Sequence, residues 1–275
     1  MRQRATTAVV LVPVLIAVLL VGEPLLAIVV GLVAALGAIE LFRLLRAAGY
    51  GSFPWLGTAL TIVVVADAAM PGILDGSGLL LIGVGMMLAA VAAFTRPDPR
   101  EGLTSWMSTI FGALYVALLA FVVRLGHAAP TLPADAPLAA LGGERGLVLL
   151  LVLVVWSYDT GAFLVGRTFG RRKFLTHISP SKTYAGLIGG LIAATIVAGA
   201  VLWALGLAPV HALLLGPLAG LAAQAGDLAE SVIKRAAGVK DSGSLMPGHG
   251  GMLDRIDSFL FAAPVVTLYV VAAFR

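Results

Sequence analysis

Long apolar segments follow one another along almost the whole chain, and they leave few folds open to it. A helix needs about 20 mostly apolar residues to cross a bilayer. Segments that approach this measure lie at about 6–22, 24–45, 55–71, 77–94, 105–125, 146–167, 184–206, 209–227 and 257–274. Only 12% of the residues are charged, about half the share of a typical soluble domain. The sequence therefore predicts an all-α, polytopic membrane protein of about nine transmembrane helices.

The distribution of basic residues indicates an orientation. With the N-terminus in the cytoplasm and nine spans, fifteen of the 18 Lys and Arg residues fall on the cytoplasmic side. The three on the outer side are Arg124, Arg145 and Arg275. This positive-inside asymmetry favours nine spans, a cytoplasmic N-terminus and a location in the cell (inner or plasma) membrane. The first apolar segment has no small-residue cleavage site after it, so we expect it to be a retained span.

Composition excludes several classes of function. The chain has no cysteine, which rules out disulfides, thiolate metal ligands and cysteine nucleophiles. Basic and aromatic residues are not interleaved as they are in proteins that stack nucleic-acid bases, so we expect no nucleic-acid partner. The sequence leaves a homodimer open.

Polar residues gather in the second half of the chain. This predicts an N-terminal transmembrane scaffold of about four spans at 1–105 and a catalytic transmembrane domain of about five spans at 106–275. We expect its site on the cytoplasmic side, formed by 156–183 and 224–258. In the scaffold, Glu40 precedes Arg43 by three residues, a spacing that indicates a structural ion pair on a helix.

Two polar groups in the catalytic domain stand out. Asp159 follows the apolar stretch 147–155, and an acidic residue within a span indicates a functional site unless it pairs with a neighbour such as Arg167. Further on, Ser179 suits a helix N-cap and Pro180 the first helical position. Such a helix start exposes N–H groups, and the adjacent Lys182 would make it suitable for phosphate.

Carboxylates recur at the ends of the last two predicted spans. Asp227, Glu230, Ser231 and Lys234 share one helix face at 100° per residue. This is the inventory of a Mg²⁺-phosphate site, although a solvated amphipathic helix end gives the same pattern. Asp254 and Asp257 form a second i,i+3 pair, at the start of the last span.

Between these helices lies a polar, glycine-rich segment. It reads Lys-Asp-Ser-Gly at 240–243 and Pro-Gly-His-Gly-Gly at 247–251. Glycine at this density allows positive φ and a close approach of backbone to a ligand. The spacing from Ser231 to Asp257, about 27 residues, resembles the signature of the phosphatidate cytidylyltransferases. The resemblance extends upstream to Asp227, the Ile-Ser-Pro-x-Lys-Thr segment 178–183 and the Asp-Thr pair 159–160. It departs at Ala185, where the family usually has a glutamate.

The resemblance implies transfer of a cytidylyl group from CTP to phosphatidate with Mg²⁺, giving CDP-diacylglycerol and pyrophosphate. The partners would be CTP, phosphatidate and the lipid bilayer. One or two cations would be held by residues drawn from Asp159, Asp227, Glu230, Asp254 and Asp257. The catalytic residues would be Asp227, Asp254, Asp257, Lys234 and Arg255. The substrate-binding residues would be Ser179, Ser181, Lys182, Thr183, Ser231, Arg235, Lys240, Asp241, Gly248, His249, Gly250 and Gly251.

Three other classes are weighed against this interpretation. A CTP-dependent polyprenol or phytol kinase would share the membrane and the nucleotide but release CDP instead of pyrophosphate. An ion-coupled transporter would explain intramembrane aspartates but would leave the glycine-rich segment without a role. The CDP-alcohol phosphotransferases also use clustered aspartates, at a spacing that this sequence does not have.

Overall fold

Helices account for the regular structure of the chain in a computed structural model, which describes residues 13, 16–70, 77–245 and 250–274. This part of the chain has no β-strand; an isolated antiparallel bridge joins Lys173 and Thr183. The α-helices are α2 Glu23–Ala47, α3 Pro54–Ala69, α4 Gly78–Ala93, α5 Pro99–Ala117, α6 Ala120–His127, α7 Gly143–Phe169, α8 Tyr184–Ala204, α9 Ala212–Ala236 and α10 Leu253–Phe274. There are also two short 3-10 helices, η1 Ala139–Leu141 and η2 Pro209–His211. The all-α prediction is confirmed for the described residues.

The helices match the predicted spans closely, with a few differences at their ends. Of the predicted span 6–22, residues 6–12, 14 and 15 lie outside the described residues, and residues 16–21 are helical. The predicted span 105–125 is divided into α5 and α6, and α5 begins earlier, at Pro99, where the Asp98 side chain caps it by accepting from Arg100 N at 2.9 Å. Helix α9 continues to Ala236, beyond the predicted end at 227, because its last turns are polar and apolar length alone does not mark them.

Six of the described segments are long and apolar enough to cross a membrane, so the chain is polytopic. They comprise α2, α5 with α6, α7, α8, η2 with α9, and α10. Helices α3 and α4 are apolar but have 16 residues each. At 1.5 Å per residue this is about 24 Å, less than the thickness of about 30 Å of a typical hydrocarbon core. The finer count of nine spans stays a prediction.

The chain divides into two compact units. The first comprises Met1–Val123 with Val232–Ile256, and the second comprises Arg124–Ser231 with Asp257–Arg275. These bounds differ from the domains predicted at 1–105 and 106–275, because a late stretch of sequence packs with the N-terminal helices. Both α9 and α10 contribute residues to each unit.

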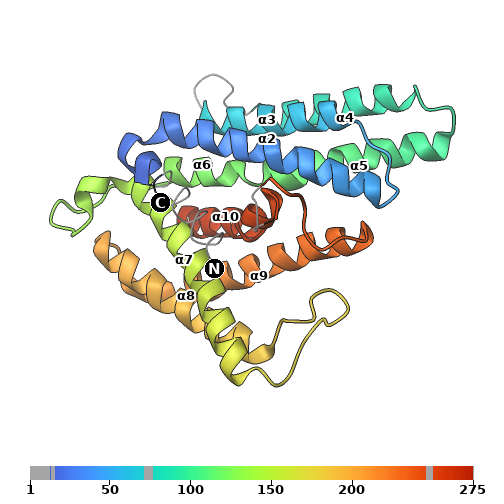
Figure 1. Cartoon of the computed structure of the whole chain (residues 1–275). Helices are drawn as coiled ribbons and strands as arrows, with labels where there is room; N and C mark the ends of the chain where they lie inside the picture. The colour runs from blue at the N-terminus through green and yellow to red at the C-terminus, as the bar shows by residue number, and fades with distance from the viewer. Residues whose placement is uncertain (1–12, 14–15, 71–76, 246–249, 275) are drawn as a thin grey trace. The chain divides into compact units, whose positions relative to one another are not determined.

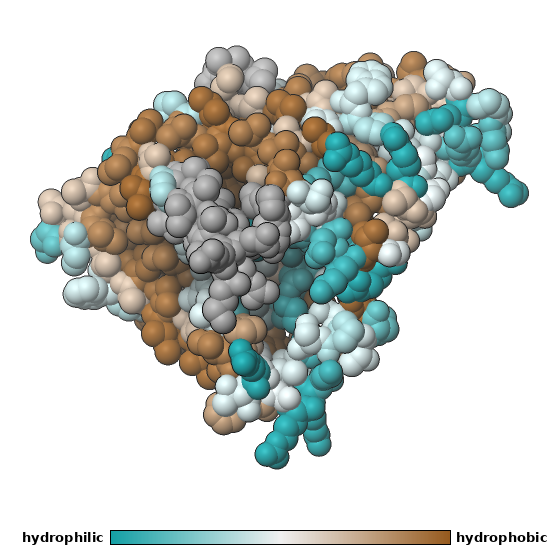
Figure 2. Space-filling view, viewed as in Figure 1, coloured by the Kyte–Doolittle hydropathy of each residue, from teal (hydrophilic) through white to brown (hydrophobic). Residues whose placement is uncertain are grey.

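In the first unit, helices α2 to α5 lie side by side (Figure 1). Phe42 of α2 is 1% exposed, and its ring packs against glycines of the neighbouring helices α3 and α5. A Cβ on Gly57 of α3 would lie 2.1 Å from the Phe42 ring, and one on Gly112 of α5 would lie 2.6 Å from it. Small residues allow such close helix packing in membranes. Hydrophilic side chains gather where α2 ends and α4 passes into α5 (Figure 2).

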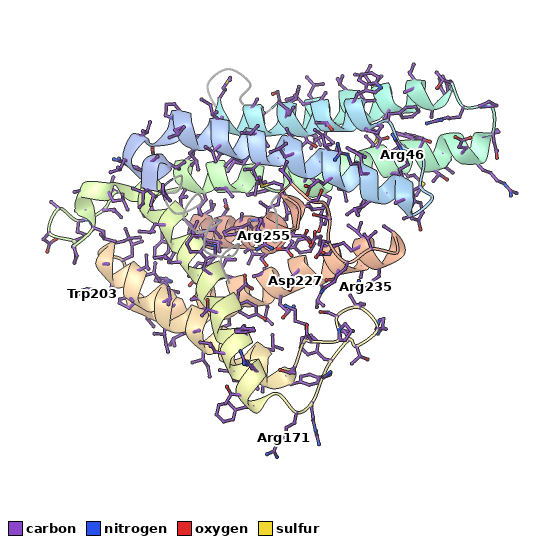
Figure 3. The ribbon with its side chains drawn as sticks, in the orientation of Figure 1. Arg46, Arg171, Trp203, Asp227, Arg235 and Arg255 are labelled. Carbon is purple, nitrogen blue, oxygen red and sulfur yellow. The ribbon has the colours of Figure 1, made fainter. Side chains whose placement is uncertain are left out.

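In the second unit, α7 and α8 form the most extensive helix pair. A Cβ on Gly161 would lie 2.6 Å from Ala193 Cβ, and one on Gly190 would lie 2.7 Å from the Tyr158 ring. Figure 3 shows Arg171 projecting from the loop after α7, and Trp203 near the other end of α8. A basic loop at one end and an exposed tryptophan at the other are typical of a membrane-crossing pair.

Gly57→Ala should destabilise the first unit by about 1–3 kcal/mol because the added methyl overpacks the Phe42 site. The measurement is the thermal midpoint of the protein purified in detergent. Gly31→Ala on α2 is the matched control, since a Cβ there meets nothing within 4 Å, and it should leave the midpoint unchanged or slightly higher. Adding Phe42→Leu to Gly57→Ala should recover part of the loss. Equal midpoints for both glycine variants would contradict this packing.

The predicted orientation can be measured by single-cysteine labelling, because the chain has no cysteine. Asp135 lies in the loop before α7 and His177 in the loop after it. In intact cells, a membrane-impermeant maleimide should label Asp135→Cys, while His177→Cys should react only after the membrane is opened. The reverse pattern would place the N-terminus outside.

Candidate active site

A cavity of about 400 Å³ lies in the second unit, where α7, α8 and α9 meet the loop between α7 and α8. Its polar side chains come from Asp159, Arg167, Ser181, Lys182, Thr183 and Gln224. Its remaining lining comes from Ala162, Phe163, Gly166, Gly186 and Leu187. The cavity thus brings together four of the residues that the sequence predicted for binding or metal, Asp159, Ser181, Lys182 and Thr183. It combines charges of both signs with an apolar wall.

Lys182 reaches from the loop to α9 and forms an ion pair with Asp227 Oδ2. Both side chains are 24% exposed. The hydroxyl of Ser231, one turn along α9, lies 3.5 Å from Asp227 Oδ1. The structure therefore joins two separate predicted segments, the Ser-Pro-Ser-Lys-Thr sequence and the carboxylate face of α9.

The start of α8 differs from the prediction. The helix begins at Tyr184, and its N-cap is Thr183, whose hydroxyl accepts from Gly186 N at 3.1 Å. Ser179, predicted as the N-cap, instead begins a turn in which its carbonyl accepts from Lys182 N at 3.3 Å. Proline at the second position of a turn has the same φ as proline in the first turn of a helix. The sequence pattern could not separate these two structures, and the turn is what directs Lys182 toward α9.

Gln224 is a buried polar residue that is not among the predicted site residues. It is 6% exposed, and its Oε1 accepts from the hydroxyl of Tyr158 at 3.0 Å. Its Nε2 has no hydrogen-bond partner within the described part of the chain. Buried amide groups are normally paired, so an amide beside a cavity can donate to a ligand oxygen. In the sequence, the sign of such a residue is a glutamine within the otherwise apolar segment 209–227.

The acidic residues of α9 and α10 meet where the two helices cross. A Cβ on Gly226 would lie 2.3 Å from the Asp257 carbonyl oxygen, so only glycine permits this approach. Asp257 lies close enough to Asp227, Asp159 and Glu230 for their side chains to influence one another electrostatically. Four of the five predicted metal-binding residues are thus neighbours in the second unit. In the described part of the chain, no three His, Asp or Glu side chains form a ready-made metal site.

The fifth, Asp254, belongs to a network in the first unit. Its Oδ1 accepts from Lys234 Nζ at 2.6 Å. Its Oδ2 accepts from Ser242 N at 2.8 Å, from Ser242 Oγ at 2.9 Å and from Gly251 N at 2.8 Å. Asp254 thereby fixes the glycine-rich segment on both sides of residues 246–249, which lie outside the described residues.

Glu40 joins the same network from α2. Its Oε2 lies 3.0 Å from Ser242 Oγ and accepts from Leu253 N at 2.8 Å. The predicted pair with Arg43 is wrong: in the described residues Glu40 bonds to the glycine-rich segment instead. No local pattern could show this, because the partners are more than 200 residues away in sequence.

The other predicted residues are less closely tied to these groups. Gly248 and His249 lie outside the described residues. Gly250 has a φ of +79°, as expected for a tight turn of glycine backbone. Exposed side chains occur at Arg235, Lys240, Asp241 and Arg255, and Arg235 Nη1 donates to the Val239 carbonyl at 2.9 Å.

Comparison with known proteins gives long matches. A protein named phosphatidate cytidylyltransferase from Pseudomonas aeruginosa is 37% identical over 280 residues, covering 99% of this chain and 98% of that protein. One of the same name from Synechocystis is 32% identical over 287 residues, covering 98% and 96%. The uncharacterized protein YnbB of Escherichia coli (strain K12) is 39% identical over 197 residues, which are 70% of this chain and 61% of YnbB.

The sequence profile of one family, described as the cytidylyltransferase family, matches residues 2–273. This match and the two nearly full-length relatives cover both the apolar N-terminal helices and the polar groups described above. The chain belongs to the cytidylyltransferase family.

Proposed function

We propose that this protein transfers a cytidylyl group from CTP to phosphatidate, producing CDP-diacylglycerol and pyrophosphate. The observation that carries the proposal is the cavity of the second unit, where Lys182 and Asp227 meet beside Asp159 and the α8 start. A site with cations and carboxylates next to apolar helices fits two polyanionic substrates of which one is a lipid. The names of the two nearly full-length relatives support this choice of substrates.

The chemistry needs positioning and charge neutralisation more than a protein nucleophile. An oxygen of the lipid phosphate attacks the α-phosphorus of CTP, and a new P–O bond forms there. The bond from that phosphorus to the oxygen bridging to the β-phosphorus breaks, and pyrophosphate leaves. The attacking phosphate is already ionised, so no general base is required. Stabilising the charge that builds up at phosphorus is then the main task.

The carboxylates fit a magnesium ion by their chemistry. Mg²⁺ prefers oxygen ligands and is commonly held by one or two carboxylates together with substrate phosphates. Asp227 and Asp254 each carry a lysine ammonium, from Lys182 and Lys234. In each pair the lysine ammonium shows that a cation can approach the carboxylate oxygen. In the second unit, Asp159, Glu230 and Asp257 complete the proposed ligand set around Asp227, while Asp254 is a separate candidate ligand in the first unit. The ion would supply Lewis-acid activation of the phosphates.

The two lysines have a second role in this proposal. When substrate is bound, Lys182 and Lys234 can turn from their carboxylates to phosphate oxygens, because a lysine side chain is a flexible point charge. The Nε2 of Gln224 donates to a further substrate oxygen. Phe163, which is 61% exposed, and Leu187 offer the apolar wall for the lipid. CTP is cytoplasmic, which is why we place the site on that side of the cell membrane.

The purified protein should release pyrophosphate only when CTP, phosphatidate and Mg²⁺ are all present. CDP-diacylglycerol should form in equal amount, measured by lipid chromatography with labelled CTP. Replacing Mg²⁺ with a chelator should abolish the reaction. Release of CDP, or consumption of CTP without a lipid product, would contradict the proposal.

Asp227→Asn should lower kcat about 100-fold or more, because a charged ligand that acts in the transition state is lost. Lys182→Met should raise KM for at least one substrate about tenfold. Combining Asp227→Asn with Lys182→Met separates a catalytic role from a structural one. Comparing the double variant with the two single variants measures the coupling between the two residues. If the pair is only structural, the double variant should recover activity; in our proposal it stays at least as impaired as Asp227→Asn.

A further inference from the structure

We propose that Glu40, on α2, is a positioning residue for the reaction: it holds Ser242 and the start of α10 so that Asp254 faces Lys234. This inference rests on the proposed function, since it assigns a role in the same reaction. It also gives the N-terminal helices a part beyond scaffolding. Glu40 is 5% exposed and Ser242 is 6% exposed, so their contact lies within the packed interior of the first unit.

The first step of the argument is the start of α10. The first N–H groups of a helix have no acceptor within the helix. Leu253 is the first residue of α10, and its N–H donates to Glu40 Oε2 at 2.8 Å. Gly251 N donates to Asp254 Oδ2 at the same end. A side chain from a distant helix therefore caps α10 next to the carboxylate that pairs with Lys234.

The second step is the hydroxyl of Ser242. It lies 3.0 Å from Glu40 Oε2 and 2.9 Å from Asp254 Oδ2. A serine hydroxyl has one proton, so at any instant it donates fully to only one of these carboxylates. The hydroxyl also lies 3.3 Å from Asp254 N, as an acceptor. Loss of the Glu40 carboxylate would thus change the hydrogen bonding of Asp254.

The third step is the shape of the surrounding backbone. A Cβ on Gly251 would lie 2.3 Å from Glu40 Oε2, and one on Gly243 would lie 2.6 Å from Glu40 Oε1. These distances are too short for any side chain. Gly243 and Gly251, two glycines of the predicted signature, therefore pack against Glu40, which is not part of that signature. Any side chain at these two positions would prevent the close contact with Glu40.

A carboxylate buried in this way costs free energy unless donors surround it, and the donors here are Ser242 of the glycine-rich segment and the first residue of α10. A role limited to fold stability would give the same contacts, so the test must separate stability from catalysis. Glu40→Leu removes both hydrogen bonds and leaves Leu253 N–H unpaired. Glu40→Gln keeps an oxygen that can accept from Leu253 N and Ser242 Oγ. Thr61→Val is the matched control, because Thr61 is also fully buried in this unit and bonds only to the Gly57 and Ala113 carbonyls.

The experiment measures steady-state kinetics with CTP, phosphatidate and Mg²⁺, together with amide hydrogen exchange of peptides covering 240–245 and 250–254. At equal folded fraction, Glu40→Leu should lower kcat/KM at least 30-fold and speed exchange in these peptides. Glu40→Gln should retain at least one third of the wild-type kcat/KM. Thr61→Val should stay within twofold of wild type and leave exchange at 240–254 unchanged.

Two results would overturn the inference. One is Glu40→Leu with kcat/KM equal to that of Thr61→Val. The other is Glu40→Gln as impaired as Glu40→Leu. If Glu40→Leu does not fold, Ser242→Ala takes its place and should lose at least tenfold, and normal activity in that variant would equally contradict the role. A wild-type protein that makes no CDP-diacylglycerol refutes the proposed function alone, since the exchange measurement still tests the contact of Glu40.

Discussion

A carboxylate at the end of an apolar helix is stable only where donors or cations surround it, and the polar parts of this protein follow from that requirement. Asp227 is paired with Lys182, and Asp254 with Lys234. Neither lysine belongs to the helix turn that carries its partner carboxylate. Each pairing therefore fixes a loop or a helix end in space, and the stabilising contact and the candidate chemistry involve the same atoms.

The polar groups also require backbone to come close to them, and glycine residues make this possible in both units. Gly226 allows α9 to cross α10 against the Asp257 carbonyl, and Gly251 allows the signature segment to contact Glu40. In each case the closest atom is polar. Glycine here serves to bring backbone against charged or hydrogen-bonding groups, as well as to pack apolar helices as at Gly57.

The helices and the local groups could be predicted from the sequence because both depend on near neighbours. The length of the apolar segments predicted helices α2 to α5 and α7 to α10. The i,i+3 spacing predicted that Asp227 and Glu230 share one helix face. The turn at Ser179 could not be predicted, because proline fixes the same φ in a turn and in a first helical turn. Glu40 could not be assigned either, since its partners depend on how distant helices pack. Gln224 was visible as an anomaly, but its role needed the Tyr158 contact.

Ala185 bears on the charge of the cavity in the second unit. The resemblance leads one to expect a glutamate there, in the first turn of α8, and this helix has no acidic residue in its first turn. The N-terminus of a helix carries about half a positive charge. Without a carboxylate to offset it, that charge adds to Lys182 and Arg167 on the cavity wall. The departure therefore makes this cavity more attractive to an anionic phosphate, and in the proposed reaction a cation would depend on Asp159, Asp227, Glu230 and Asp257 of the same unit.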